Sequence, residues 1–112
     1  MLRVIDLTTL SGAYAARLFA EQGHEVIRVE SPDGDEVRRL APFLRGRQDL
    51  EHSAFHQFLN AGKKSVAIDV KSPEGQKALV DLLGTADVLL ANAPLPIGEA
   101  ACLAADARFS LL

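Results

Sequence analysis

The chain has 112 residues, 48% of them hydrophobic, and its formal net charge is −3. This length suits a single domain with a buried core. The near balance of charge argues against general nucleic-acid binding, which favours a clearly basic face. No apolar stretch approaches the roughly 20 residues of a membrane helix, so we expect no membrane partner. A single cysteine, Cys102, allows no intrachain disulfide and favours a reducing cytoplasm.

Apolar runs and amphipathic segments alternate along the chain. In order, the sequence predicts strand 3–7, helix 11–23, strand 25–30, a loop with short helical turns over 31–48, helix 50–60, strand 65–70, helix 72–84 and strand 87–93. Strands without polar alternation, separated by helices, predict a parallel sheet covered on both faces. Right-handed crossovers then give a Rossmann-like α/β fold.

We expect residues 1–112 to form one such domain, and an incomplete one. The final "RFSLL" resembles the opening of a fifth strand. A compact domain rarely stops inside a central strand, so the sequence is expected to be a piece of something longer.

Two of the predicted helices show which residues share a face. In helix 11–23, Tyr14 and Leu18 are spaced four residues apart on one side, and so are Ala15 and Phe19. In the last predicted helix, which has Ser72 at its N-cap and Pro73 in its first turn, three leucines are expected to be buried. These are Leu79, Leu82 and Leu83.

Sheets of this kind bind ligands outside the carboxyl ends of their strands. Lys71 falls at that edge, where it either meets an anionic ligand or is a solvated lysine. Lys63 and Lys64 fall at the opposite edge, and we predict that both are solvated. Asp6 lies inside the first strand and needs hydrogen-bond partners; we expect it to hold a neighbouring loop rather than to catalyse.

Two other kinds of site find little support. The three glycine positions of a dinucleotide-binding loop correspond to Leu7, Thr9 and Gly12, and only the last is glycine, so we expect no NAD. His52 and His56 have a spacing that can hold zinc, but no third ligand is evident nearby. We therefore expect a surface pair of histidines and no metal.

Three stretches together resemble a known family. They are "RVIDLT" at 3–8, "GHEVIRVESPDGDEVRR" at 23–39 and "FLNAGKKSVAIDVKSPEGQKALVDLLGTADVLLAN" at 58–92. The succession resembles the N-terminal portion of the family III CoA-transferases, which include the α-methylacyl-CoA racemases. The resemblance runs from about residue 3 to the end of the chain.

The resemblance implies a cytosolic enzyme with a Rossmann-like large domain and a small domain, in which two chains interlock. Such enzymes move CoA between carboxylic acids, or epimerise an acyl-CoA, without metal or nicotinamide. The transferases use a catalytic aspartate downstream of this stretch, so this chain alone is expected not to catalyse. The implied partners are CoA or acyl-CoA, a second copy of the chain, or a separate remainder of the enzyme.

The resemblance also places CoA along the carboxyl ends of the strands. The adenine and the ribose phosphate would lie beside one strand end, the pantetheine would pass a second, and the reacting end would face the loop after the first strand. The corresponding residues are Ile68, Asp69, Val70 and Lys71 for the nucleotide, Asn92 and Ala93 for the pantetheine, and Thr9 for the loop.

Departures from the family pattern bear on how tightly CoA would bind. No basic residue lies between Lys77 and Arg108, although arginine forks are the usual way to hold phosphates. Arg38 and Arg39 either grip a phosphate or are exposed loop charges, and with Lys71 they would compensate only in part. Two functions therefore remain: part of a CoA-transferase or racemase, or a degenerate, non-catalytic interaction or structural module.

Overall fold

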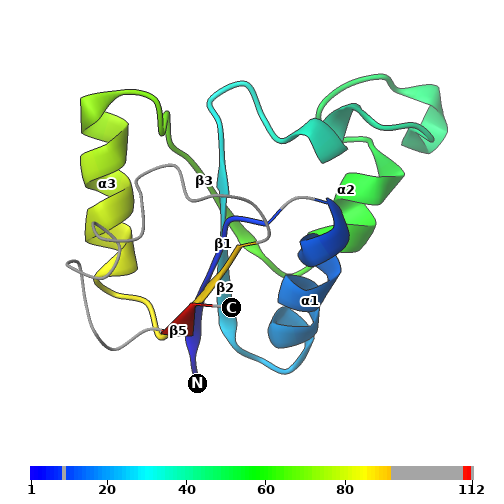
Figure 1. Ribbon diagram of the computed structural model, residues 1–112. Coiled ribbons are helices and arrows are strands. Elements are labelled where there is room, and N and C mark those ends of the chain that lie inside the picture. Colours follow the sequence, from blue (N-terminus) through cyan, green and yellow to red (C-terminus); the bar gives the residue numbers. More distant parts are fainter. Residues whose placement is uncertain (9, 92–109, 112) are drawn as a thin grey trace.

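The computed structural model describes residues 1–8, 10–91 and 110–111 (Figure 1). Strands and helices alternate, with two short 3-10 turns after the second strand. In chain order the elements are β1 (Arg3–Asp6), α1 (Leu10–Glu21), β2 (Glu25–Glu30), η1 (Glu36–Arg39), η2 (Leu44–Gly46), α2 (Ala54–Leu59), β3 (Lys64–Ala67), α3 (Pro73–Leu83), β4 (Val88–Leu90) and β5 (Ser110–Leu111). The order predicted from the sequence is confirmed.

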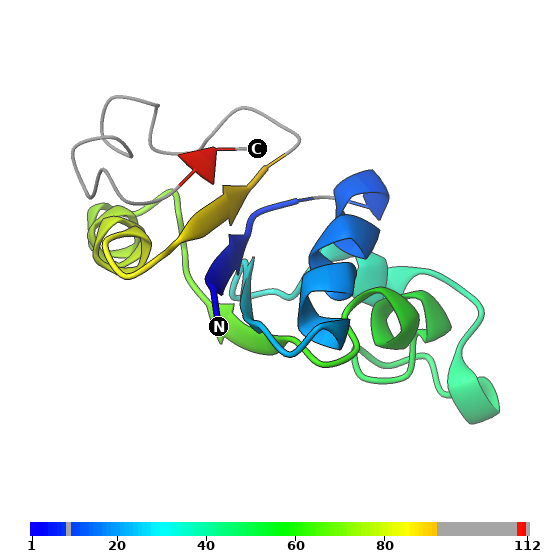
Figure 2. The ribbon, with the colours of Figure 1, turned by 90° about the horizontal axis from the view of Figure 1, so that it is seen from below.

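The strands form one parallel sheet in the order β3-β2-β1-β4-β5. α3 covers one face, and α1 and α2 cover the other, as Figures 1 and 2 both show. The chain runs outward from β1 to β3 and then returns through α3 to β4 on the other side of β1, so the strand order reverses at β1. This is the predicted Rossmann-like sheet with helices on both faces. Within the described ranges, no helix is long and apolar enough to span a membrane.

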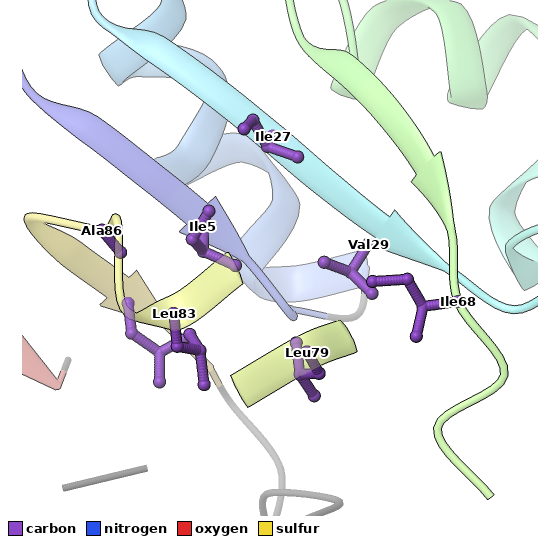
Figure 3. Packing of buried hydrophobic residues seen from close by; sticks show 8 residues of the cluster. Ile5, Ile27, Val29, Ile68, Leu79, Leu83 and Ala86 are labelled. Carbon is purple, nitrogen blue, oxygen red and sulfur yellow. The ribbon is translucent and has the colours of Figure 1, made fainter. Parts of the chain in front are cut away.

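The face under α3 holds the largest apolar core. Ile5 of β1 pairs in register with Ile27 of β2 and Leu89 of β4, and all three point toward α3. Figure 3 shows Leu79 and Leu83 of α3 meeting them from the other side. Successive side chains of a strand point to opposite faces of the sheet, so every second residue of each strand faces α3.

α3 begins and ends where the sequence predicts. The Ser72 hydroxyl accepts from the Gly75 amide at 2.9 Å, Pro73 is in the first turn, and Gly84 follows the last turn. Two of the three leucines expected to be buried, Leu79 and Leu83, are inaccessible to solvent. Leu82 is only half-buried at the margin of the core, because the contact side of α3 is narrower than the apolar pattern.

α1 packs on the sheet through small residues. Ala16 lies against Val4 and Val26, whereas Tyr14 and Leu18 are exposed. Of the apolar side that the spacing predicts, Phe19 packs against this cluster, whereas Tyr14 and Leu18 do not. Alanines let the helix axis approach closely, while Tyr14 stacks on Phe58 of α2, with ring centroids 6.1 Å apart.

β3 is shorter than predicted and ends at Ala67 instead of continuing to Val70. Its last link to β2 is the Ile68 amide, which donates to the Glu30 carbonyl at 2.8 Å. From Asp69 the chain turns away from the sheet to form the cap of α3. β5 pairs with β4 over Ser110–Leu111, so the predicted fifth strand is confirmed at those two residues.

Candidate functional site at the carboxyl edge of the sheet

A bidentate ion pair closes the carboxyl end of β2. Arg38 of η1 donates from Nε and Nη2 to the two carboxylate oxygens of Glu30, at 2.7 and 2.9 Å. Ser65 of β3 and the Asp35 amide donate to the same carboxylate. The Arg38 hydrogen bond is the largest cause that lowers the pKa of Glu30 to about 2. The strand end that a nucleotide-binding enzyme would use for a ribose is therefore occupied by an internal salt bridge.

A hollow of about 190 Å³ lies beside this ion pair, at the carboxyl ends of β2 and β3. Its walls include Ser31, Gly34, Leu50 and Ala67, together with the Glu30–Arg38 pair. The remaining Arg38 nitrogen, Nη1, donates to the Leu50 carbonyl and to Glu51. The protein itself thus uses most of the guanidinium donors, and of the two alternatives for Arg38 the structure excludes an exposed loop charge.

Lys71 projects from a tight turn between β3 and α3. The Asp69 carboxylate accepts from the Lys71 amide at 3.1 Å, and the Asp69 carbonyl accepts from the Ser72 hydroxyl at 3.0 Å. Gly75 must be glycine here, since an added Cβ would lie 1.6 Å from the Asp69 carbonyl oxygen. Lys71 is exposed, and within the described residues its ammonium forms no ion pair. The turn is held by these hydrogen bonds and presents an exposed positive charge.

A buried ion network lies under the start of α1. Asp6 at the end of β1 accepts from the amide and hydroxyl of Thr8, at 2.9 and 2.6 Å. Arg28, its register partner on β2, donates to Asp6 at 3.2 Å and also to Asp35 and to the Thr8 carbonyl. The prediction that Asp6 holds a neighbouring loop is confirmed. The sequence analysis missed the cations around it, although an arginine inside an apolar strand beside a strand aspartate was a signal for this pairing.

Lys63 is the second cation of the network, and the prediction that it is solvated is wrong. Its side chain is 1% exposed, and its ammonium donates to Asp6, to Asn60 and to the Ala13 carbonyl at 2.8–2.9 Å. Burial lowers the pKa of Lys63, and the Asp6 charge opposes that effect. Lys64 next to it is 72% exposed and pairs with Glu25 at the surface, as expected. The long side chain of Lys63 runs under α1 from the amino end of β3 to Asp6 at the carboxyl end of β1.

The two histidines each bond to a protein side chain. His52 Nδ1 lies 2.5 Å from the Asp49 carboxylate, and His56 Nδ1 lies 3.1 Å from the Asn60 amide nitrogen. Both rings are half-buried instead of forming the exposed pair that was expected. Burial lowers the pKa of His56. In the part of the chain that the structure describes, no group of three potential ligands is arranged to hold a metal ion.

The predicted site residues have three outcomes. Ile68, Asp69, Val70 and Lys71 lie at the carboxyl end of β3, with Ile68 buried in the core and the rest in the turn. Arg38 lies nearby at the end of β2. Thr9, Asn92 and Ala93 are outside the described residues, as is Cys102.

The fold and the carboxyl edge of the sheet together define the class of protein. It is a Rossmann-like parallel sheet whose polar groups gather at the carboxyl ends of its strands. The model of CoA-transferase family III matches residues 2–105, and the chain belongs to this family. The resemblance drawn from the sequence is thereby confirmed.

Relatives and solved structures agree with this assignment. The chain is 39% identical over 88 residues to the succinyl-CoA:(R)-benzylsuccinate CoA-transferase subunit BbsE of Thauera aromatica, covering 79% of this chain and 22% of that protein. It is 41% identical over 91 residues to the cinnamoyl-CoA:phenyllactate CoA-transferase of Clostridium sporogenes, covering 80% and 22%. A CAIB/BAIF family protein from Brucella suis superposes with a TM-score of 0.84 at 26% identity, over 98% of this chain and 31% of that one. The chain thus spans about a fifth of the length of these curated relatives.

Proposed function

We propose that this chain is the N-terminal part of a CoA-transferase that moves CoA between carboxylic acids, and that it contributes the binding site for the nucleotide half of CoA. One observation carries the proposal: Lys71 is exposed in a hydrogen-bonded turn at the carboxyl end of β3, and its ammonium forms no ion pair with the residues that the structure describes. Ala67, which lines the hollow at the ends of β2 and β3, lies just before that turn in the sequence. A ribose phosphate at Lys71 would extend its adenine toward this part of the edge.

In this proposal the ligand follows the carboxyl edge of the sheet. β2 and β1 follow β3 across the sheet, and β4 follows β1. A CoA anchored at Ile68, Asp69, Val70 and Lys71 would run along the carboxyl edge toward Thr8 and the start of α1. We propose Thr9 for the reacting end and Asn92 with Ala93 for the pantetheine.

Arg38 has a different part in this proposal. Its donors are largely taken by Glu30, Glu51 and the Leu50 carbonyl, so it shapes the hollow more than it supplies free charge. Glu51 is exposed and can be displaced at little cost. A phosphate at Arg38 would take the place of that carboxylate.

The acyl-carrying nucleophile lies elsewhere in this proposal. Acyl transfer through an anhydride requires an accessible carboxylate. Asp6 is buried between two cations, and Asp35 accepts from Arg28. Asp69 is engaged in its turn. We therefore expect the 112-residue chain to bind CoA without catalysing transfer.

Calorimetry with CoA at low salt tests the site. Lys71→Ala should weaken binding by about 10- to 100-fold, since one charge-assisted hydrogen bond contributes roughly 1.5–3 kcal/mol. Lys64→Ala removes an exposed lysine at the opposite edge and should leave the affinity unchanged. The wild-type affinity should fall with added salt.

Three results would count against the proposal. Tight binding that ignores Lys71→Ala would put the site elsewhere, and acyl exchange by the purified chain would overturn the assignment of the nucleophile. A chain that binds no CoA at all would favour the alternative, a non-catalytic interaction module.

We also propose that the chain works in the cytoplasm as a homo-oligomer or with a separate remainder of the enzyme. Exposed Tyr14, Leu18, Phe55 and Phe58 on α1 and α2 give an apolar surface that such an assembly would cover. Sedimentation should show a dimer or larger species at micromolar concentration. A clean monomer would remove the homo-oligomer.

A further inference from the structure

Charged side chains hold the β1–α1 connection, in addition to the packing of Leu7 on the apolar core. Asp6 grips Thr8 by its amide and hydroxyl, and Arg28 donates to the Thr8 carbonyl. On the other side of the connection, Lys63 donates to the Ala13 carbonyl in the first turn of α1. One carboxylate and two cations thus hold both ends of the segment that joins the sheet to α1.

Lys63 brings the separate elements to one point. The three acceptors of its ammonium lie on different elements: Asp6 ends β1, Ala13 belongs to α1, and Asn60 caps α2. An ammonium has three donors, and each finds a partner here. The side chain reaches this point from the residue just before β3, so it ties the position of α1 and α2 to the β2–β3 side of the sheet.

Charge balance keeps the network in place. Two carboxylates, Asp6 and Asp35, face two cations, Arg28 and Lys63, so no net charge is buried. Apolar residues of similar volume would stabilise such a site as well or better. A directional set of hydrogen bonds differs from apolar contacts in that it fixes the orientation of its partners.

We infer that Lys63 is a positioning residue, which sets the first turn of α1 at the carboxyl edge of the sheet for the reacting end of the pantetheine arm of CoA. The inference rests on the proposed function for its ligand, since the path along the edge leads from Lys71 past β2 to Thr8 and α1. The nucleotide half, held at the end of β3, does not depend on the position of α1. Lys63 therefore affects one half of CoA and leaves the other half alone.

Two measurements on Lys63→Met test the inference, with Lys64→Met as the matched control. The first is amide hydrogen exchange without ligand, comparing α1 with α3 in each variant. Loss of global stability in Lys63→Met accelerates exchange in both helices, and we expect exchange in α1 to accelerate at least about 10-fold more than exchange in α3. Lys64→Met should change neither helix. Equal acceleration in both helices would show a general loss of stability and overturn the positioning role.

The second measurement is the affinity for two probes, CoA and adenosine 3′,5′-bisphosphate, which is the nucleotide half alone. Lys63→Met should weaken CoA about 10-fold and leave the bisphosphate within about twofold. Equal changes for both probes would overturn the role in holding the pantetheine arm. If the wild type binds neither probe, the proposed function fails, and the exchange experiment still decides whether Lys63 fixes α1.

Asn60→Ala covers the case in which Lys63→Met does not fold. It removes one acceptor of the ammonium and keeps the Lys63–Asp6 pair. Exchange in α1 should again accelerate more than exchange in α3, by about threefold. Equal acceleration of α1 and α3 in Asn60→Ala, or no acceleration of either helix, would overturn the inference, as it would in Lys63→Met.

Discussion

The two faces of the sheet are built from the same strands with opposite chemistry. Toward α3, the strands present Ile5, Ile27 and Leu89, all in one apolar cluster. Toward α1 and α2, the neighbouring residues Asp6 and Arg28 form a buried ion pair at the carboxyl end. This second face also has an apolar cluster, in which Val4, Val26 and Leu90 meet Ala16 of α1. One face stabilises the fold, and the other holds the connections that lead to the ligand edge.

The difference teaches what each kind of contact can do. Apolar burial is non-directional and scales with area, so the α3 side tolerates small shifts. Buried ion pairs add little net stability but are costly to break, so they keep α1 and η1 in one arrangement. Substitutions on the two faces should therefore differ in what they change as well as in size.

Breaking the charged face at Lys63 should have the largest effect. Lys63→Met leaves Asp6 and Asp35 against Arg28 alone, and removing one partner of a buried pair costs about 3–5 kcal/mol. The control, Lys64→Met, breaks an exposed pair with Glu25 and should cost less than about 1 kcal/mol. Urea unfolding followed by circular dichroism measures both. Similar costs for the two lysines would mean that Lys63 is solvated after all.

Breaking the apolar face at Leu79 comes next. Leu79→Ala removes a side chain that no solvent reaches and should lower the free energy of unfolding by about 2–5 kcal/mol. Leu82→Ala, three residues further along α3 and half-buried, should cost clearly less. Thermal unfolding distinguishes them. A larger loss of stability in Leu82→Ala would show that Leu82 lies on the buried side of α3, as the sequence predicted.

Acid should act on the charged face alone. The pKa of Glu30 is lowered from 4.5 to about 2, chiefly by Arg38, so the carboxylate stabilises the fold above pH 4.5. That stabilisation is lost as the pH falls from 4.5 through 2, and amounts to at most about 3 kcal/mol. Glu30→Gln should remove this part of the pH dependence. An unchanged slope of stability between pH 5 and 2 would show that the Glu30–Arg38 pair does not form.

Lys71→Ala should have the smallest effect on the fold. Its side chain is exposed and forms no ion pair among the described residues, and such substitutions usually change stability by no more than about 0.5 kcal/mol. Its melting temperature should match the wild type while its CoA affinity falls. A marked loss of stability would indicate that Lys71 supports the turn rather than a ligand.

Much of the fold and part of the site were predictable because their signals are local. Ser72, Pro73 and Gly84 bound α3 through caps and turn preferences that act within a few residues. Apolar runs such as 25–30 predict strands, and the alternation with helices predicts the parallel sheet. The position of Asp69–Lys71 at the carboxyl edge was predictable too, since this edge follows from strand direction.

Tertiary structure alone decided the state of Lys63 and Lys64. The sequence places two identical residues side by side, and nothing local distinguishes them. One side chain is buried against Asp6, 57 positions away in the chain, while the other pairs with Glu25 at the surface. Likewise, spacing put Tyr14, Leu18 and Phe19 on one side of α1 but could not show that Phe19 packs against the sheet while the other two stay exposed. The sequence by itself determined which segments become helices and strands, because backbone preference and periodicity are local. Which charges are buried was decided only when β1, α1, α2 and β3 met, because the free energy of a buried charge depends on partners that the chain brings together in space.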